Sequence, residues 1–235
     1  MNDVRDTTHR ADQGQSYRTL DIHAAPGVHE HALDMCRAVL SHGARILEVG
    51  AGSGALTLRL QDAGFEVVAT DLEPNQPWIH ALNLDDPTAT AAVAGRFDMI
   101  VCVETMEHLE NPRAALRLMR SLLDPGAQLL VSTPNVTHPH SRLKTLFDGA
   151  PWFFGTDAYY DTGHITPLPD WLLVEHLRST GFEDIHLERA GDSGISSRIR
   201  TVAHRVEHAV LWLVGVRQPV EAGDGCCLFA LATAP

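Results

Sequence analysis

A short apolar run followed by three glycines at alternate positions, Arg45-Ile-Leu-Glu-Val-Gly-Ala-Gly-Ser-Gly54, constrains the fold more than any other segment of this chain. The run predicts a buried strand over residues 46–49, and the leucine spacing after it predicts a helix over 55–62. Glycine lacks a Cβ, so the chain can turn tightly here and a ligand can lie against the bare backbone. The first N–H groups of the helix are free to bind that ligand. The segment therefore predicts a strand–loop–helix nucleotide site.

Strand and helix patterns alternate along the rest of the chain. Apolar runs predict strands over 46–49, 66–70, 78–84, 97–103, 128–132, 182–189 and 226–233, and helical spacing predicts helices over 28–40, 55–62, 109–123, 168–180 and 197–214. This alternation favours a largely parallel sheet with helices on both faces. A chain of 235 residues suits one sizeable core, so we expect a single domain over 1–235. Residues 1–16 are polar, have no apolar period, and are expected to be disordered.

The charge balance argues against nucleic acid as a partner. Lys and Arg number 18 against 30 Asp and Glu, for a net charge of −12, whereas nucleic-acid binding uses a basic face that displaces counterions. No segment resembles a signal peptide, no apolar run is long enough to span a bilayer, and the four cysteines lack metal-binding spacing. We therefore expect a reduced, cytoplasmic protein with a small-molecule substrate, and a homodimer as one assembly.

Two cofactors compete for the glycine loop. Gly50, Gly52 and Ala55 loosely match the dinucleotide fingerprint G-x-G-x-x-G/A, which predicts a nicotinamide-dependent oxidoreductase. Glu48 favours a different cofactor, because a carboxylate at the strand end would repel a pyrophosphate but suits a ligand with an ammonium and a sulfonium. Asp71, at the end of the second predicted strand, fits either cofactor by accepting hydrogen bonds from ribose hydroxyls.

The glycine segment resembles motif I of the class I S-adenosylmethionine (SAM) methyltransferases, whose pattern is hh(D/E)hGxGxG. Two further stretches resemble the same family, Phe97-Asp-Met-Ile-Val-Cys-Val-Glu104 with Glu107-His108, and Leu123-Asp-Pro-Gly-Ala-Gln-Leu-Leu-Val-Ser-Thr-Pro-Asn135. The likeness covers residues 20–190 and points to the ubiquinone-type O-methyltransferases and the methyltransferase 11, 12 and 23 group. It implies a Rossmann-like, doubly wound α/β fold with seven strands, mostly parallel, and an antiparallel seventh strand beside the sixth.

The resemblance also implies which residues hold SAM. Glu48, Gly50, Ala51, Gly52 and Gly54 would hold the methionine portion, Asp71 the ribose, and Asn83 or Asp85 the adenine edge, with Leu72 and Leu84 as apolar walls and Glu104 beside the cofactor. About six residues separate Asp71 from the third predicted strand. The helix that usually joins these strands is therefore expected to be very short or missing.

A second constellation predicts the chemistry of the acceptor. Glu104, Glu107 and His108 stand at i, i+3 and i+4, so a helical turn would place them on one face. With His164 they resemble the metal ligands of the small-RNA 3′-terminal 2′-O-methyltransferases and of the ubiquinone-type catechol O-methyltransferases. This implies Mg, Mn, Fe or Zn bound to the acceptor hydroxyl. In the metal-free alternative His108 or His164 is the general base, and the Glu107 carboxylate interacts favourably with the positive N-terminus of a helix. His108, His164 and Glu107 are the candidate catalytic residues.

Residues 135–168 are the predicted substrate lid, because insertions after the fifth strand lie over the cofactor's methyl group in this fold. Their aromatic side chains suit a ring-bearing acceptor or pack the lid onto the body, and Arg142 and Lys144 are candidates to meet a phosphate or carboxylate. We expect in-line SN2 transfer of a methyl group from SAM to a small-molecule hydroxyl. The alternatives are a nicotinamide-dependent oxidoreductase, an RNA-terminal 2′-O-methyltransferase and a non-catalytic SAM-binding protein.

Overall fold

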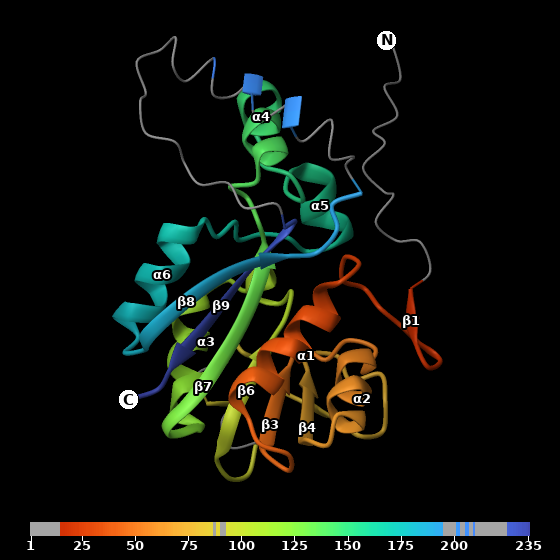
Figure 1. Ribbon diagram of the computed structural model, residues 1–235, viewed down its shortest axis with the longest axis vertical. Helices are drawn as coiled ribbons and strands as arrows, with labels where there is room; N and C mark the ends of the chain where they lie inside the picture. The colour runs from red at the N-terminus through yellow and green to blue at the C-terminus, as the bar shows by residue number, and fades with distance from the viewer. Residues whose placement is uncertain are drawn as a thin grey trace.

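A seven-stranded sheet with the order β5-β4-β3-β6-β7-β9-β8 forms the centre of the molecule (Figure 1). The computed structural model describes residues 15–86, 88–89, 93–194, 201–202, 205–206, 209 and 225–235. The strands are β3 (Arg45–Val49), β4 (Glu66–Asp71), β5 (Ile79–Ala81), β6 (Phe97–Cys102), β7 (Leu123–Pro134), β8 (Glu183–Ala190) and β9 (Cys227–Thr233). The pairs among β5, β4, β3, β6 and β7 are parallel, whereas β9 is antiparallel to both β7 and β8. The predicted Rossmann-like sheet with an antiparallel seventh strand is confirmed.

Helices cover both faces of the sheet because successive strand residues point to opposite sides. On β6, Met99 and Val101 pack in one apolar cluster with α1 (Val28–Val39) and α2 (Ala55–Asp62). Ile100 and Cys102 pack in the other cluster, with α3 (Pro112–Ser121) and α6 (Asp170–Ser179). The central strands are therefore buried on both faces, which explains their continuous apolar runs.

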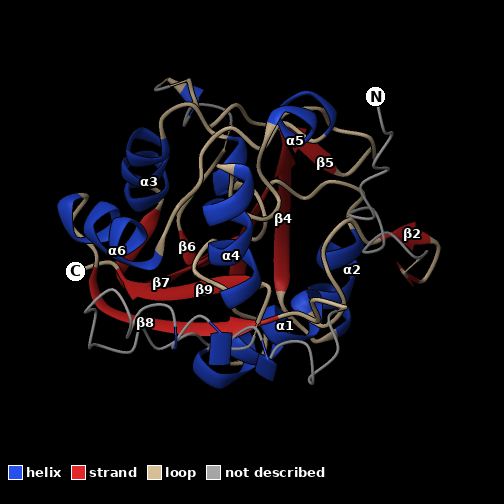
Figure 2. Cartoon of the chain, turned by 90° about the horizontal axis from the view of Figure 1, so that it is seen from above, coloured by secondary structure: helices blue, strands red, loops and turns tan. Residues whose placement is uncertain are grey.

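The segment after β7 lies beyond the carboxyl ends of the parallel strands. It contains α4 (Pro139–Asp148) and α5 (Thr156–Asp161), which lie above the sheet in Figure 1 and over its end in the view from above in Figure 2. A small hairpin, β1 (Ser16–Tyr17) and β2 (Leu20–Asp21), packs against α2, where the Tyr17 hydroxyl donates to Asp62 at 2.7 Å. These additions surround the end of the sheet where its loops gather.

Several element limits differ from the prediction. The third strand, predicted over 78–84, is only Ile79–Ala81, and the fifth, predicted over 128–132, is Leu123–Pro134. The helix predicted over 109–123 begins at Pro112, because the Asn111 side chain caps it by accepting from the Ala114 N–H. No helix forms in the described residues 72–78 between β4 and β5, as predicted.

Two further predictions fall largely on residues that are not described. Disorder was predicted over 1–16, of which only residues 15 and 16 are described, and Ser16 pairs with Asp21 in β1 and β2. The helix predicted over 197–214 lies mostly outside the described residues as well. None of the helices in the described part of the chain has the length and hydropathy needed to cross a bilayer.

Candidate functional site

A cavity of about 820 Å³ opens where β3, β4 and β6 end. The strand order reverses at β3, which lies between β4 and β6, and ligands of open α/β sheets bind outside the carboxyl ends at such a point. The walls come from the glycine loop, the ends of β4 and β5, the turn after β6, the lid and the segment before α1. Segments far apart in the sequence therefore meet at one site.

The glycine loop forms the floor of this cavity. Gly50, Ala51 and Gly52 line it, and the Gly50 and Ala51 N–H groups donate to the Thr70 carbonyl at 2.9 and 3.0 Å. Gly50 has φ +75°, and a Cβ there would lie 2.1 Å from Thr105 Oγ1. Gly54 is the residue before α2, whose N-terminus has no side-chain cap, and it does not line the cavity. The loop thus turns tightly beside the cavity, and the Ala55 N–H at the start of α2 donates to the Ser53 hydroxyl at 3.3 Å.

The predicted nucleoside residues also line the cavity. Asp71 is held by two backbone N–H groups, since Oδ2 accepts from Gly52 at 2.8 Å and Oδ1 from Glu73 at 3.0 Å. Asp85 is held in the same way by the N–H groups of Glu110 and Asn111, at 3.2 and 3.0 Å. The remaining lining residues at this end include Leu72, Asn83 and Leu84. Both carboxylates are therefore fixed before any ligand arrives.

Glu48 lies behind the loop and not in the cavity wall. Its side chain is buried, and Oε2 accepts from the Thr57 hydroxyl of α2 at 2.5 Å. Burial raises the pKa of Glu48 from 4.5 to about 8, opposed by the Thr57 hydrogen bond. Its side chain packs inward and ties β3 to α2. The expectation that Glu48 helps to hold the methionine portion of the cofactor stays a prediction.

This buried acid makes the stability of the protein depend on pH. The folded-state pKa lies above the ordinary 4.5, so the contribution of Glu48 to stability is largest below pH 4.5 and is lost as the pH rises towards 8. We expect the unfolding free energy without cofactor to fall over this range, by up to about 1.4 kcal/mol per pH unit. Urea titrations at several pH values measure it. Glu48→Gln should flatten the dependence while keeping the Thr57 bond, and the exposed Glu66→Gln should not. An unchanged slope in Glu48→Gln would contradict the assignment.

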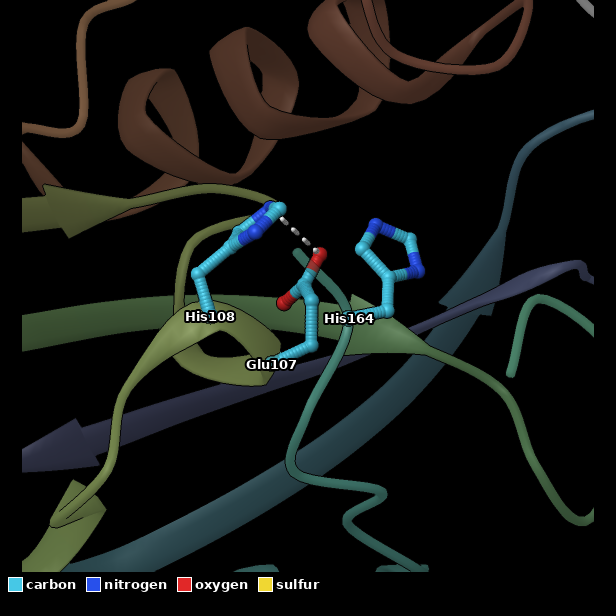
Figure 3. A group of neighbouring side chains, drawn as sticks. All are labelled: Glu107, His108 and His164. Carbon is cyan, nitrogen blue, oxygen red and sulfur yellow. Dashed lines mark ion pairs between the residues drawn. The ribbon is translucent and has the colours of Figure 1, made fainter. Parts of the chain in front are cut away.

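At the lid end of the cavity the structure brings Glu107, His108 and His164 together. One ligand atom from each lies within 4.8 Å of the others, and Figure 3 shows the Glu107 carboxylate between the two rings. His108 Nδ1 is 3.2 Å from the Gly163 carbonyl, and His164 Nδ1 is 2.8 Å from the Phe153 carbonyl. When Nδ1 of each ring carries the proton, it donates to that carbonyl, and Nε2 of both rings is left as an acceptor.

Glu104 is separate from this group. The helical turn begins only at Met106, as the 3-10 turn η2 (Met106–His108), so the predicted i, i+3, i+4 face does not include Glu104. Glu104 has φ +50°, and its carboxylate accepts from the Ser132 hydroxyl at 2.9 Å and from the Cys227 thiol at 3.3 Å. It lines the cavity beside the proposed cofactor position but is not in the three-residue cluster.

Burial sets the charge of these groups. Burial raises the pKa of Glu104 and of Glu107, and the nearby Glu104 carboxylate raises the pKa of Glu107 further. Burial lowers the pKa of both His108 and His164. Both Glu107 carboxylate oxygens are buried without a hydrogen-bond partner in the described structure. An unpaired buried carboxylate is costly. The Glu107 Oε1 atom lies 4.0 Å from His108 Nε2, which is too long for a hydrogen bond. The cluster therefore offers a carboxylate and two imidazoles to a cation or to a ligand N–H or O–H group.

The segment before α1, together with the first turn of that helix, is a wall that the sequence did not indicate. Asp21, His23 and His29 line the cavity, and the Ser53 hydroxyl of the glycine loop donates to the Asp21 carbonyl at 2.5 Å. Burial lowers the pKa of His29 to about 4, so its ring is neutral at neutral pH. These residues belong to no motif, and only the folding of the segment over the loop brings them to the site.

Comparisons with known proteins agree with this geometry. The family model described as a methyltransferase domain matches residues 22–187. A ubiquinone biosynthesis O-methyltransferase of Xanthomonas axonopodis pv. citri is 37% identical over 149 residues, which cover 55% of this chain and 61% of that protein. A ubiquinone biosynthesis O-methyltransferase of Xanthomonas campestris pv. campestris is 31% identical over 153 residues, which cover 58% of this chain and 63% of that protein. The chain thus spans about three fifths of the length of these relatives.

Solved structures share the fold at low identity. A SAM-dependent methyltransferase from Archaeoglobus fulgidus has a TM-score of 0.57 at 16% identity, covering 87% of this chain and 94% of that one. Phosphoethanolamine N-methyltransferase 2 of Haemonchus contortus, in complex with SAM, has a TM-score of 0.58 at 15% identity. The match covers 90% of this chain and 54% of that one.

Proposed function

Since the chain belongs to the methyltransferase-domain family and is a class I SAM-dependent methyltransferase, we propose that it transfers the methyl group to a hydroxyl of a small, ring-bearing acceptor. The observation that carries the proposal is the group of Glu107, His108 and His164 at the lid end of the cavity. Two imidazoles with lowered pKa values are neutral at neutral pH and can take the proton that a hydroxyl loses. The similarity to O-methyltransferases supports the same chemistry.

The cavity residues divide between cofactor and acceptor in this proposal. The Gly50–Gly52 backbone holds the methionine portion, Asp71 accepts from the ribose hydroxyls, and Asn83 and Asp85 meet the adenine edge. The methyl group then faces the lid end. The acceptor oxygen attacks the methyl carbon in line as the carbon–sulfur bond breaks, S-adenosylhomocysteine (SAH) leaves, and the acceptor proton passes to Nε2 of His108 or His164. The protein contributes mainly alignment and a fixed electrostatic environment.

The same three residues fit a divalent cation. A buried carboxylate without a partner and two imidazole Nε2 atoms form a mixed oxygen and nitrogen donor set that suits Mg, Mn, Fe or Zn. Such an ion, when bound, lowers the pKa of a coordinated acceptor hydroxyl. Glu104 supports the group from the side through Ser132 and Cys227.

Location and assembly are part of the proposal. The four cysteines are all free thiols, which supports a reducing compartment such as the cytoplasm. A homodimer stays a prediction.

Methyl transfer from labelled SAM tests the reaction. We expect catechol to be methylated on oxygen with one SAH released per turnover, and o-phenylenediamine, its diamine counterpart, to be methylated at least about tenfold more slowly. EDTA should lower the rate if the cation is required, and Mg, Mn, Fe and Zn added back singly identify it. Faster methylation of the diamine would contradict O-methylation. Tight SAM binding with no product from any acceptor would favour a non-catalytic SAM-binding protein.

A further inference from the structure

The cavity wall is strongly one-sided in charge. Of the described residues that line it, seven are Asp or Glu and four are His, and none is Lys or Arg. Clefts lined by charge of one sign concentrate the electrostatic field and attract ligands of the opposite sign. Two of the seven carboxylates, Glu107 and Asp161, lie at the lid end, where the acceptor is proposed to bind, and Glu104 lies beside the proposed cofactor position. The cofactor accounts for only part of this charge, since SAM carries one net positive charge.

Glu107 indicates that a cationic or donor group belongs there. Its side chain is fully buried, and neither carboxylate oxygen has a hydrogen-bond partner in the described structure. A divalent cation at Glu107 would offset this carboxylate and one further charge, such as that of the neighbouring Glu104. It would not offset Asp161, which is outside the three-residue cluster.

Asp161 is the charged residue at the mouth of this end. It is the last residue of α5, it is exposed, and its side chain forms no hydrogen bond or ion pair with any described residue. Thr162, His164 and Phe153 line the cavity with it. The Phe153 ring is stacked on Trp152 with centroids 4.2 Å apart, so Trp152 holds the ring in place, and Phe153 and Asp161 line the same cavity. This combination suits a ring with a positively charged substituent.

The basic residues that were candidates to meet an anionic acceptor are not part of the wall. Arg142 and Lys144 do not line the cavity. Lys144 Nζ lies 3.5 Å from Oδ2 of Asp148, which is one helical turn further along α4. A carboxylate or phosphate on the acceptor would enter this cavity among like charges and lose its hydration without a cationic partner.

We propose that the methyl acceptor is a hydroxylated aromatic molecule that carries a positively charged amine, with the amine at Asp161 and the ring against Phe153. This inference rests on the proposed O-methylation. It excludes acceptors with a carboxylate or phosphate near the ring, including an RNA terminus.

Three catechols that differ only in the charge of a two-carbon side chain test it. They are 3,4-dihydroxyphenethylamine (cationic), 3,4-dihydroxyphenylethanol (neutral) and 3,4-dihydroxyphenylacetate (anionic). We expect kcat/KM at pH 7.5 to fall by about tenfold at each step from cation to neutral to anion, and the differences to shrink as the ionic strength rises. In Asp161→Asn the ratio of cation to neutral should fall at least about fivefold. Asp157→Asn, on the same helix but outside the cavity wall, should keep the ratio.

Calorimetric binding of the same three compounds to the SAH-saturated protein separates this inference from the proposed reaction. If no compound is methylated but the cation binds most tightly, and Asp161→Asn removes that preference, O-methylation fails while the charge preference stands. If all three bind equally, if the anion binds best, or if none binds, the inference is overturned.

Discussion

Gly50→Ala is expected to weaken SAM binding by at least about 100-fold, as measured by calorimetry. Gly50 has φ +75°, which costs an L-residue with a Cβ roughly 1–2 kcal/mol, and the new Cβ would lie 2.1 Å from Thr105 Oγ1 and 2.8 Å from Cγ2. Thr105 has little freedom to move, because its hydroxyl is 3.1 Å from the Val103 carbonyl and the residue leads directly into η2. The glycine loop must therefore shift away from the cofactor, and a 100-fold loss of affinity corresponds to about 2.7 kcal/mol of backbone strain and lost contacts.

Two further variants separate the clash from the backbone strain. Gly126→Ala introduces the same strain at φ +82° in open space, far from the cavity, so it should lower stability without changing SAM affinity. Gly50→Ala combined with Thr105→Ala removes both close atoms and should recover part of the affinity. Normal SAM affinity in Gly50→Ala would show that the loop is not the cofactor floor. Equal losses in the single and double variants would show that Thr105 is not the obstacle.

Removing the Glu107 carboxylate is expected to lower kcat by about 10²–10⁴-fold, the range usual for loss of an acid–base or metal-binding group. SAM affinity should change little, because the residues assigned to the cofactor lie elsewhere in the cavity. Glu107→Leu should also keep or raise the melting temperature, since an apolar side chain of similar size replaces a buried carboxylate whose oxygens have no hydrogen-bond partner. Loss of activity together with unchanged or greater stability is the signature of a residue kept for function.

Glu107→Gln tests the role of charge, because the amide keeps the shape of the side chain. It should lose activity like the leucine variant, and added divalent metal should not restore it. Glu110→Gln is the control, since Glu110 is an exposed acid two residues beyond η2. Full activity of Glu107→Gln in the presence of EDTA would remove Glu107 from both the metal and the acid–base proposals.

Much of the cofactor half of the site was predictable from the sequence. Gly50, Gly52 and Asp71 stand at fixed distances from buried strands, and the carboxyl ends of parallel strands meet at one edge of the sheet. Local spacing and strand order were therefore enough to bring them to one cavity. The same reasoning did not show that the Glu48 side chain turns away from the cavity wall, because spacing does not tell which face of a strand end turns inward.

The acceptor half depended on tertiary contacts. The sequence paired Glu107 with His108 by spacing, and only the family resemblance added His164. This residue lies more than fifty positions away, and its ring is held by the Phe153 carbonyl. Glu104 is not in the cluster, because the chain does not become helical until Met106. No sequence motif indicated four of the residues that line the cavity, Asp21, His23, His29 and Asp161.

By itself the sequence determined the parallel sheet and the glycine loop, because these follow from short-range periodicity and from glycines that only a tight loop requires. Its likeness to the motifs of the SAM methyltransferases indicated the methyl donor. The tertiary structure alone decided the acid-lined lid end, the buried carboxylate without a partner and the segment that closes the cavity before α1. Burial and charge at those positions come from side chains far apart in the chain, and no local pattern encodes how such side chains meet.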